Sequence, residues 1–334
     1  MDPKIIFLFI VINLFLLFFF KELSSSINIF DYPDSIRKFH KKKIPLIGGY
    51  IILINLLLIF SINYLFKEYL SSSILNEKKS LFFIISFCTL FFLGTLDDKY
   101  LLSANKKLFI SSIILLFFLY FDTQMILREI RFSFLEKKII LNNFSIIFTL
   151  FCFLLFINAF NMFDGINLQS GLYGLISLIY LIFLNPNEVF YYVIIIALLF
   201  FLFLNYKNKT FLGDGGSYLI SFILGCGFIK NYNTSNIIYA DQIFLIMLFP
   251  GLDLLRLSII RILNKRHPFS PDRLHVHHLL LEKFKYNKTI LIIFFLMLFS
   301  GTLSVNSLYN YLYVIIFILI YLYLIFFLTV KKKK

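Results

Sequence analysis

The chain has 334 residues, of which 60% are hydrophobic and only 15% are charged. Soluble proteins of this size are less apolar and do not carry uninterrupted apolar runs that are long enough to cross a bilayer. The composition therefore excludes an ordinary soluble protein and predicts a single polytopic membrane domain over residues 1–334.

The apolar runs predict an all-α bundle of about ten or eleven transmembrane helices. Three runs are short for a span and fit re-entrant or buried helices equally well: Leu108–Phe121, Leu172–Leu184 and Tyr218–Phe228. The other predicted spans are Ile5–Phe20, Leu46–Phe66, Leu81–Leu96, Phe144–Ala159, Val189–Leu204, Ile243–Leu263, Ile290–Val305 and Tyr311–Val330. No Ala-x-Ala-like cleavage site follows the first run, so we expect it to be retained rather than removed as a signal peptide.

The formal net charge of +14 comes largely from loops between these runs, where basic residues set the orientation of a membrane protein. We therefore expect the lipid bilayer, and no nucleic acid, as a partner. The basic side should be cytoplasmic, which places the protein in the inner (plasma) membrane with its N-terminus outside and its C-terminus inside. The segments on this side are 21–45, 97–107, 160–171, 205–217, 264–289 and the Lys331–Lys334 tail.

Residues 126–141, on the opposite side, alternate in part between apolar and polar side chains. A period of two is typical of strands and predicts a small external β-hairpin. Cys88, Cys152 and Cys226 lie inside apolar runs, so we interpret them as small buried hydrophobic residues without a disulfide or metal role.

Asp97 and Asp98 follow directly after the apolar run Leu81–Leu96. Two adjacent carboxylates at the end of a helix repel each other and lie at the negative end of the helix dipole. They are either solvated acids that end a span or part of a site that handles a cation or a proton.

Polar side chains also gather near residue 160. In a helix, Asn158, Asn161 and Asp164 recur every three residues and share one face, and their oxygens suit a hard cation such as Mg²⁺. The alternatives are a polar contact between helices and an Asx turn at Asp164 and Gly165.

The segment Leu212–Ser217 reads Leu-Gly-Asp-Gly-Gly-Ser and precedes a predicted span. Asp214 is suited to cap the helix that follows. Alternatively, Gly213 and Gly215 leave backbone N–H groups open to a phosphate, while Asp214 holds the metal ion that bridges it.

Two further segments on the cytoplasmic side are basic. Lys41–Lys43 is an ordinary cytoplasmic anchor, and the glycines Gly48 and Gly49 after it allow a backbone or a ligand to come close. The segment His267–His278 invites a zinc interpretation, but no Cys or acid stands at a structural-zinc spacing. Arg and His are also good donors to phosphate oxygens.

These segments together hold carboxylates and amides for Mg²⁺, glycines at helix starts, and an Arg/His cluster. Such groups equip a site for phosphoryl transfer, in which positioning and charge neutralisation do most of the work. Their position at one membrane face implies one substrate in the cytosol and one in the bilayer.

With these motifs the chain resembles the polyprenyl-phosphate N-acetylhexosamine-1-phosphate transferases of glycosyltransferase family 4. The resemblance covers nearly the whole chain and keeps the family's order of motifs. It rests on Arg37–Gly49, Asp97-Asp98, Asn158–Gly165, Leu212–Ser217 and Pro271–His278. It implies the transfer of sugar-1-phosphate from a UDP-N-acetylhexosamine to undecaprenyl phosphate, with release of UMP, as the start of a cell-surface glycan such as O-antigen.

The resemblance also implies roles for single residues. Asn161 and Asp214 would hold Mg²⁺, with Mn²⁺ as the alternative ion. Asp97 would activate the lipid phosphate as a base beside Asp98, unless one of this pair acts as a nucleophile. Asp164 would order the site or contact the nucleotide.

Further roles follow from the same motifs. His275 and His277 would join the catalytic group. Substrate contacts are expected from Arg37, Lys38, Lys106, Asn158, Asn167, Gly213, Gly215, Ser217, Arg273 and His278.

The motif Pro271–His278 favours the branch that uses UDP-N-acetylglucosamine or a related sugar. One departure stands after Asn167, where the family usually has Gly-Leu and this chain has Leu168–Gly171 (Leu-Gln-Ser-Gly); it bears on nucleotide or sugar preference. The muramoyl-pentapeptide reaction of peptidoglycan synthesis is a second hypothesis. A transporter or flippase is a third, although the acids lie at one face and no inverted repeat is visible. A homodimer is left open.

Overall fold

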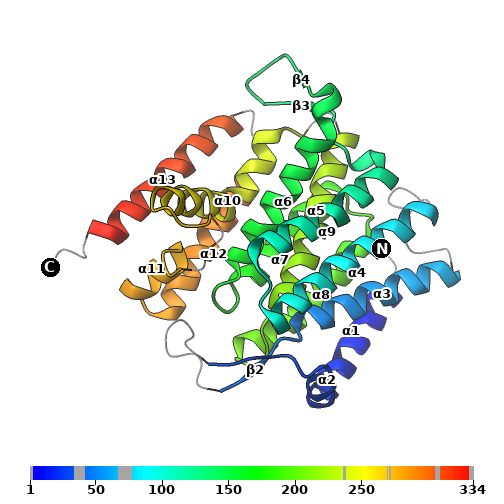
Figure 1. Ribbon diagram of the computed structural model, residues 1–334. Coiled ribbons are helices and arrows are strands. Elements are labelled where there is room, and N and C mark those ends of the chain that lie inside the picture. Colours follow the sequence, from blue (N-terminus) through cyan, green and yellow to red (C-terminus); the bar gives the residue numbers. More distant parts are fainter. Residues whose placement is uncertain are drawn as a thin grey trace. The chain divides into compact units, whose positions relative to one another are not determined.

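The computed structural model describes residues 3–33, 42–66, 77–235, 238–268, 270, 272–304 and 309–330. Within these ranges the chain forms thirteen α-helices and two short strand pairs (Figure 1). The predicted fold class, a helical membrane bundle, is confirmed. Arg37, Lys38 and the Lys331–Lys334 tail lie outside the described residues.

The chain divides into two compact units, the first made of Met1–Thr123 and Leu178–Leu224 and the second of Gln124–Ser177 and Gly225–Lys334. Elements of the first unit are α1 (Pro3–Phe18), α2 (Phe20–Ile27), β1 (Phe30–Asp31), β2 (Ile44–Pro45), α3 (Gly48–Phe66), α4 (Glu77–Tyr100), α5 (Ala104–Phe121) and α8 (Val189–Tyr206). That both units act as one domain stays a prediction.

The second unit holds the β-hairpin and the C-terminal helices. Its elements are β3 (Glu129–Ile130), β4 (Ile139–Ile140), α6 (Ser145–Phe163), α10 (Ala240–Leu263), α11 (Val276–Lys283), α12 (Tyr286–Leu303) and α13 (Asn310–Val330). Two helices, α7 (Gln169–Leu184) and α9 (Gly213–Thr234), contribute residues to both units.

Every predicted span falls on a helix, but not every such helix is long and apolar enough to cross a membrane. Eight helices of the described chain meet that condition, and a ninth span results if α1 and α2, which are bent by 68°, count as one. The predicted short run Leu108–Phe121 belongs to α5, whose 18 residues suffice. In contrast, α7 has only 16 residues, and α9 begins with Asp214 among glycines and ends in polar residues.

The predicted hairpin is present. Strands β3 and β4 pair antiparallel, with Glu129 opposite Ile140 and Ile130 opposite Ile139. A second antiparallel pair, β1 with β2, was not expected from the sequence; it sets Phe30 opposite Pro45. This pair brings Asp31 to the entry of α3.

Aromatic side chains fill the core of the first unit. Phe83 of α4 is almost fully buried, with ring centroids 5.6 Å from Phe222, 6.1 Å from Phe190 and 6.3 Å from Phe118. Tilted and edge-on aromatic pairs of this kind are favourable beyond the area that they bury. The many Phe residues of the sequence therefore have a packing role.

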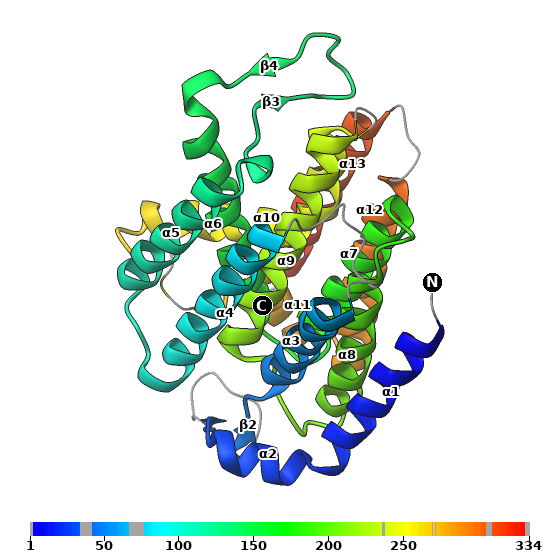
Figure 2. The same cartoon turned by 90° about the vertical axis from the view of Figure 1, so that its right-hand side faces the viewer.

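One polar contact joins the buried faces of α1 and α3. The amides of Asn13 and Asn55 donate to each other's carbonyl oxygen at 2.7 and 3.1 Å, and both side chains are almost fully buried. Helices α1, α3 and α8 lie side by side around this contact (Figure 2). Between apolar helices, a paired amide fixes the register because an unpaired one would be costly.

We expect the substitution Asn13→Leu to lower the free energy of unfolding by about 1–2 kcal/mol, because the amide of Asn55 loses its partner. The measurement is the unfolding midpoint in detergent. The double variant Asn13→Leu/Asn55→Leu should recover part of this loss, since neither buried amide is then left unpaired. Purely additive losses would contradict this interpretation.

Candidate functional site

The first unit gathers the acidic motifs at the start of α9. Asp97 and Asp98 lie in the last turn of α4, and α9 begins at Gly213, directly before Asp214. The structure thus brings together two motifs that stand more than a hundred residues apart in the sequence.

Asp98 caps the start of α9. Its Oδ1 accepts the backbone N–H of Asp214 at 3.0 Å, and its Oδ2 accepts that of Gly215 at 3.4 Å. A carboxylate is stabilised at the positive end of a helix dipole. The cap comes from another helix rather than from Asp214, and the N–H groups that we expected to meet a phosphate are bonded to Asp98.

Asp97 has a different set of partners. Its Oδ1 accepts the backbone N–H of Leu102 at 2.7 Å, and its Oδ2 accepts the ammonium of Lys107 at 2.5 Å. Asp97 is buried. Lys106, for which we expected a substrate contact, is exposed to solvent, so the neighbouring lysine is the one that reaches the acidic cluster.

The third acid, Asp214, lies beside the other two. A hydrogen bond joins its carboxyl group to that of Asp97. Burial, this contact and the charge of Asp98 raise the pKa of the Asp214 carboxyl well above its ordinary value. Three crowded carboxyl groups suit the approach of a further cation.

Glycines allow the helices to come this close. A β-carbon on Gly94 of α4 would stand 2.5 Å from the backbone of Asp214, and one on Gly49 of α3 would stand 2.5 Å from the Cα of Gly216. Gly213 has a φ of +75°, which side chains other than glycine rarely adopt. Here the glycines let backbone pack on backbone.

The second unit holds the asparagine motif at the end of α6. Asn158 lies within the helix and donates to the carbonyl of Leu154 at 2.7 Å. Asn161 is also in α6, but the helix ends at Phe163, and Asp164 is the residue that follows it. The expected face of three residues is therefore limited to the two asparagines.

Asp164 points back to the segment that departs from the family pattern. Its Oδ1 accepts a hydrogen bond from the hydroxyl of Ser170. The neighbouring Gln169 contacts the ring nitrogen Nδ1 of His277 at 3.4 Å. The segment Leu168–Gly171 thus supports both Asp164 and the histidine motif. Asn167 offers its backbone carbonyl to the hydroxyl of Tyr286 at 2.9 Å.

The histidines of the predicted motif, His275, His277 and His278, lie at the start of α11. This segment packs against the turn that follows α6. The ring of His277 is buried so close to Gly165 that a β-carbon there would collide with it. Burial lowers the pKa of His277 well below its ordinary value. Burial and the charges of His275 and Arg273 lower the pKa of His278 to about 4. Both rings are therefore neutral near pH 7.

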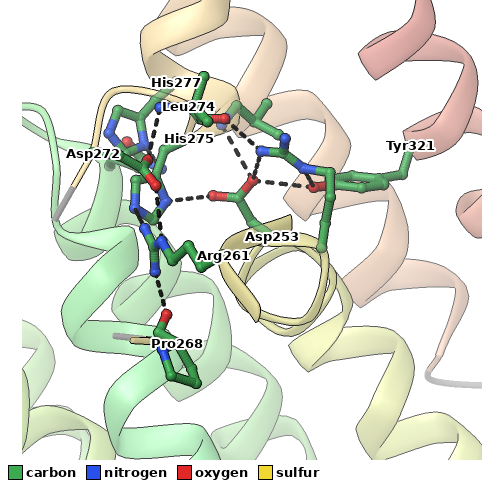
Figure 3. A network of polar contacts seen from close by, with 11 residues as sticks. Asp253, Arg261, Pro268, Asp272, Leu274, His275, His277 and Tyr321 are labelled. Carbon is green, nitrogen blue, oxygen red and sulfur yellow. Dashed lines mark hydrogen bonds and ion pairs between the residues drawn. The ribbon is translucent and has the colours of Figure 1, made fainter. Parts of the chain in front are cut away.

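Two arginines of α10 hold the segment that precedes α11 (Figure 3). Arg261 donates from Nε to Asp272 at 2.8 Å and from Nη1 to the carbonyl of Pro268 at 2.6 Å. Arg256 donates to the carbonyl of Leu274 at 2.5 Å. Arg273 itself is exposed.

Several residues of these networks were not singled out from the sequence as site residues. They share a position in or beside an apolar helix, where an ionisable side chain is a functional candidate by default. This rule could have identified Asp253, Arg256 and Arg261, because they are ionisable residues within the predicted span Ile243–Leu263. The residues are Lys107, Asp253, Arg256, Arg261 and Tyr321.

No group of three or more His, Cys, Asp or Glu side chains is arranged as a ready metal site within the part of the chain that the structure describes. The carboxylates of Asp97 and Asp98 have protein donors as partners. Mg²⁺ in phosphate-transfer sites is held by one or two carboxylates with substrate phosphates and water. A site built on Asp214 fits this arrangement.

Comparisons with known proteins support one family. Residues 80–231 match glycosyl transferase family 4, a range that includes the acidic and asparagine motifs. The chain is 28% identical over 292 residues to the undecaprenyl-phosphate alpha-N-acetylglucosaminyl 1-phosphate transferase of Salmonella typhi, which covers 83% of this chain and 75% of that protein.

Two further relatives carry the same name. The protein of Escherichia coli K12 is 26% identical over 296 residues, which is 84% of this chain and 76% of the relative. The protein of Thermotoga maritima is 28% identical over 305 residues, which is 91% of this chain and 90% of the relative. The similarity therefore extends over most of the chain, as the order of motifs indicates.

We expect the substitution Gly94→Ala to lower the free energy of unfolding by about 1–3 kcal/mol, because the added methyl group collides with the backbone of Asp214. The matched control is Gly251→Ala in α10, where a β-carbon meets nothing within 4 Å. That variant should be neutral or slightly more stable, because alanine favours a helix. Equal melting temperatures for the two variants would contradict the proposed close packing.

Proposed function

Because residues 80–231 match glycosyl transferase family 4, we propose that the chain transfers N-acetylhexosamine-1-phosphate from a UDP-sugar to undecaprenyl phosphate and releases UMP. N-acetylglucosamine-1-phosphate is the expected group, in line with the names of the relatives. The observation that carries this proposal is the meeting of Asp97, Asp98 and Asp214 at the start of α9.

In this reaction an oxygen of the lipid phosphate attacks the β-phosphorus of the UDP-sugar. The bond from that phosphorus to the bridging oxygen breaks, and UMP leaves with the electron pair. Because little covalent chemistry is left to the protein, its task is to position the phosphates and to balance their charge. The polar segments of both units are suited to that task.

We propose that Asp97 receives the proton of the lipid phosphate where one is present. Its bonds to Leu102 and Lys107 orient the carboxylate. Lys107 then stands next to the incoming phosphate as a compensating cation. The helix cap formed by Asp98 makes it a positioning residue, and the alternative of a nucleophilic acid fits it less well.

A divalent cation, Mg²⁺ or alternatively Mn²⁺, would neutralise charge on the pyrophosphate when bound. Asp214 is the residue that we propose to hold it, because its carboxyl group is crowded by like charges. That Asn161 shares this ion stays a prediction, since the two residues belong to different units.

The second unit is proposed to bind the sugar nucleotide. Arg273 is exposed, and the neutral ring of His278 is half-buried beside it. An arginine recognises phosphate oxygens in a bidentate manner, and a neutral imidazole donates one hydrogen bond. Asp164 and Asn167, which contact Ser170 and Tyr286, are the residues that we propose to contact the nucleotide.

A large apolar cavity in the second unit is proposed to receive part of the prenyl chain. Its volume is about 760 Å³, and it lies among the hairpin, α6, α9, α10 and α13. Phe148, Cys152 and Phe156 of α6 line it, and the same helix continues to Asn161. The rise of an α-helix separates Cys152 from Asn161 by about 14 Å, which a long isoprenoid spans easily.

The setting of the reaction follows from the same proposal. We expect the catalytic segments to face the cytoplasm of the inner membrane, where UDP-sugars are made, and the hairpin to lie outside. The product would begin a cell-surface glycan such as O-antigen.

The reaction is tested by UMP release from purified protein in detergent, with undecaprenyl phosphate, Mg²⁺ and a panel of UDP-N-acetylhexosamines that includes UDP-N-acetylmuramoyl-pentapeptide. We expect release that requires both lipid and metal and is fastest with UDP-N-acetylglucosamine. Asp97→Asn and Asp214→Asn should lose activity by a factor of about 10³ or more, because the first removes the proton acceptor and the second removes the proposed metal ligand.

Both variants should keep the melting behaviour of the wild type within a few degrees, which separates lost chemistry from lost folding. Full activity of Asp214→Asn would overturn the metal assignment. Preference for the muramoyl donor would move the chain to the other branch, and no release with any donor from folded protein would overturn the proposed reaction.

The cavity is tested by filling it. We expect Cys152→Phe to raise the KM for undecaprenyl phosphate about tenfold, which corresponds to ~1.4 kcal/mol of lost binding. The KM for a short prenyl phosphate should not change, because its chain does not reach the cavity. The matched control is Cys88→Phe on α4, which lies in the first unit. Equal effects on long and short chains would contradict the assignment.

A further inference from the structure

Asp253 is a buried carboxylate of α10 that lies outside every motif used above. Only 3% of its surface is exposed. Its Oδ2 lies 2.7 Å from the ring nitrogen Nδ1 of His275 (Figure 3). This contact joins a membrane helix to the first histidine of the motif.

The other oxygen of the same carboxylate accepts hydrogen bonds from three donors. Oδ1 accepts from Nη2 of Arg256 at 2.8 Å, from the hydroxyl of Tyr321 at 3.0 Å and from the backbone N–H of Val276 at 3.2 Å. The last bond fixes the first residue of α11. Asp253 therefore orients the side chain of His275 and the backbone of the residue after it.

These contacts decide where His275 carries its proton. An ionised carboxylate only accepts hydrogen bonds, so the ring nitrogen that faces it must be protonated. In the neutral ring the other nitrogen, Nε2, is then an acceptor. Nη2 of Arg261 lies 3.5 Å from this nitrogen, an arrangement that agrees with Nε2 as an acceptor.

We propose that Asp253 is a positioning residue for the reaction: it holds His275 in the tautomer with the proton on Nδ1, so that Nε2 accepts from Arg261, and it thereby fixes the start of the segment that carries the other histidines. This inference rests on the proposed function. It adds Asp253 and, through it, α10 and α13 to the machinery of the site.

The substitution Asp253→Asn tests this with little change of shape. Asparagine has one acceptor oxygen and one NH₂ group. Arg256, Tyr321 and Val276 all donate to the Oδ1 position, so the oxygen must stay there and the NH₂ group must face His275. Since an NH₂ group donates, the ring nitrogen facing it must lose its proton. The variant therefore forces the opposite tautomer.

The readout is the nitrogen spectrum of [¹⁵N]histidine-labelled protein in nanodiscs at alkaline pH. The chain has 5 His, and His275→Gln identifies the signal of interest. We expect the wild type to carry the proton on Nδ1 and Asp253→Asn to carry it on Nε2. The kcat of UMP release should fall about 10- to 100-fold, as when other carboxylates that orient a functional histidine are removed.

The matched control is Tyr321→Phe. It removes one donor from the Oδ1 position but leaves the carboxylate and its bond to His275 in place. The tautomer should stay as in the wild type, and any loss of activity should be smaller than that of Asp253→Asn. A general loosening of the network would affect both variants alike.

Two results would overturn the proposal. One is a wild-type spectrum with the proton of His275 on Nε2, which can be read even where Asp253→Asn does not fold. The other is an Asp253→Asn variant that loses activity while the tautomer is unchanged. Failure of the proposed function would look different: wild-type protein would release no UMP, while its histidine spectrum would still report the tautomer.

Discussion

The acidic cluster depends on the close contact between the backbones of three helices at the first turn of α9. Gly94 of α4 and Gly49 of α3 lie where any side chain would collide with that turn. Because these two positions are glycines, the last turn of α4 comes close enough for Asp98 to accept the first N–H groups of α9. Asp98 is thus unfavourably placed on its own helix but stands at the positive end of another, which offsets the cost.

This contact divides the acid pair into two roles. The neighbours Asp97 and Asp98 have opposite surroundings: one bonds an ammonium and a loop N–H, and the other caps a helix. The first is oriented by the flexible side chain of Lys107. Asp214, crowded by both, is the member of the cluster that we propose to hold a metal ion.

The second unit uses a carboxylate in a similar way. There Asp253, from a helix that is long enough to span the membrane, accepts the N–H at the start of α11 and a ring N–H of His275. In both units an acid on an apolar helix accepts a backbone N–H at the start of another helix and thereby fixes the segment that begins there. A rigid helix is a better support for such a segment than a loop, because it loses little entropy on ordering.

The sequence by itself determined the helical membrane class, the hairpin and the order of the motifs, because these depend on local periodicity and spacing. It could not tell Lys106 from Lys107, since adjacent positions on a helix differ only by the direction in which they point. It also placed Asp164 on a helix face, although α6 ends one residue earlier. Which acid caps α9 and which carboxylate orients His275 were decided by tertiary structure alone, since both contacts join residues from different helices.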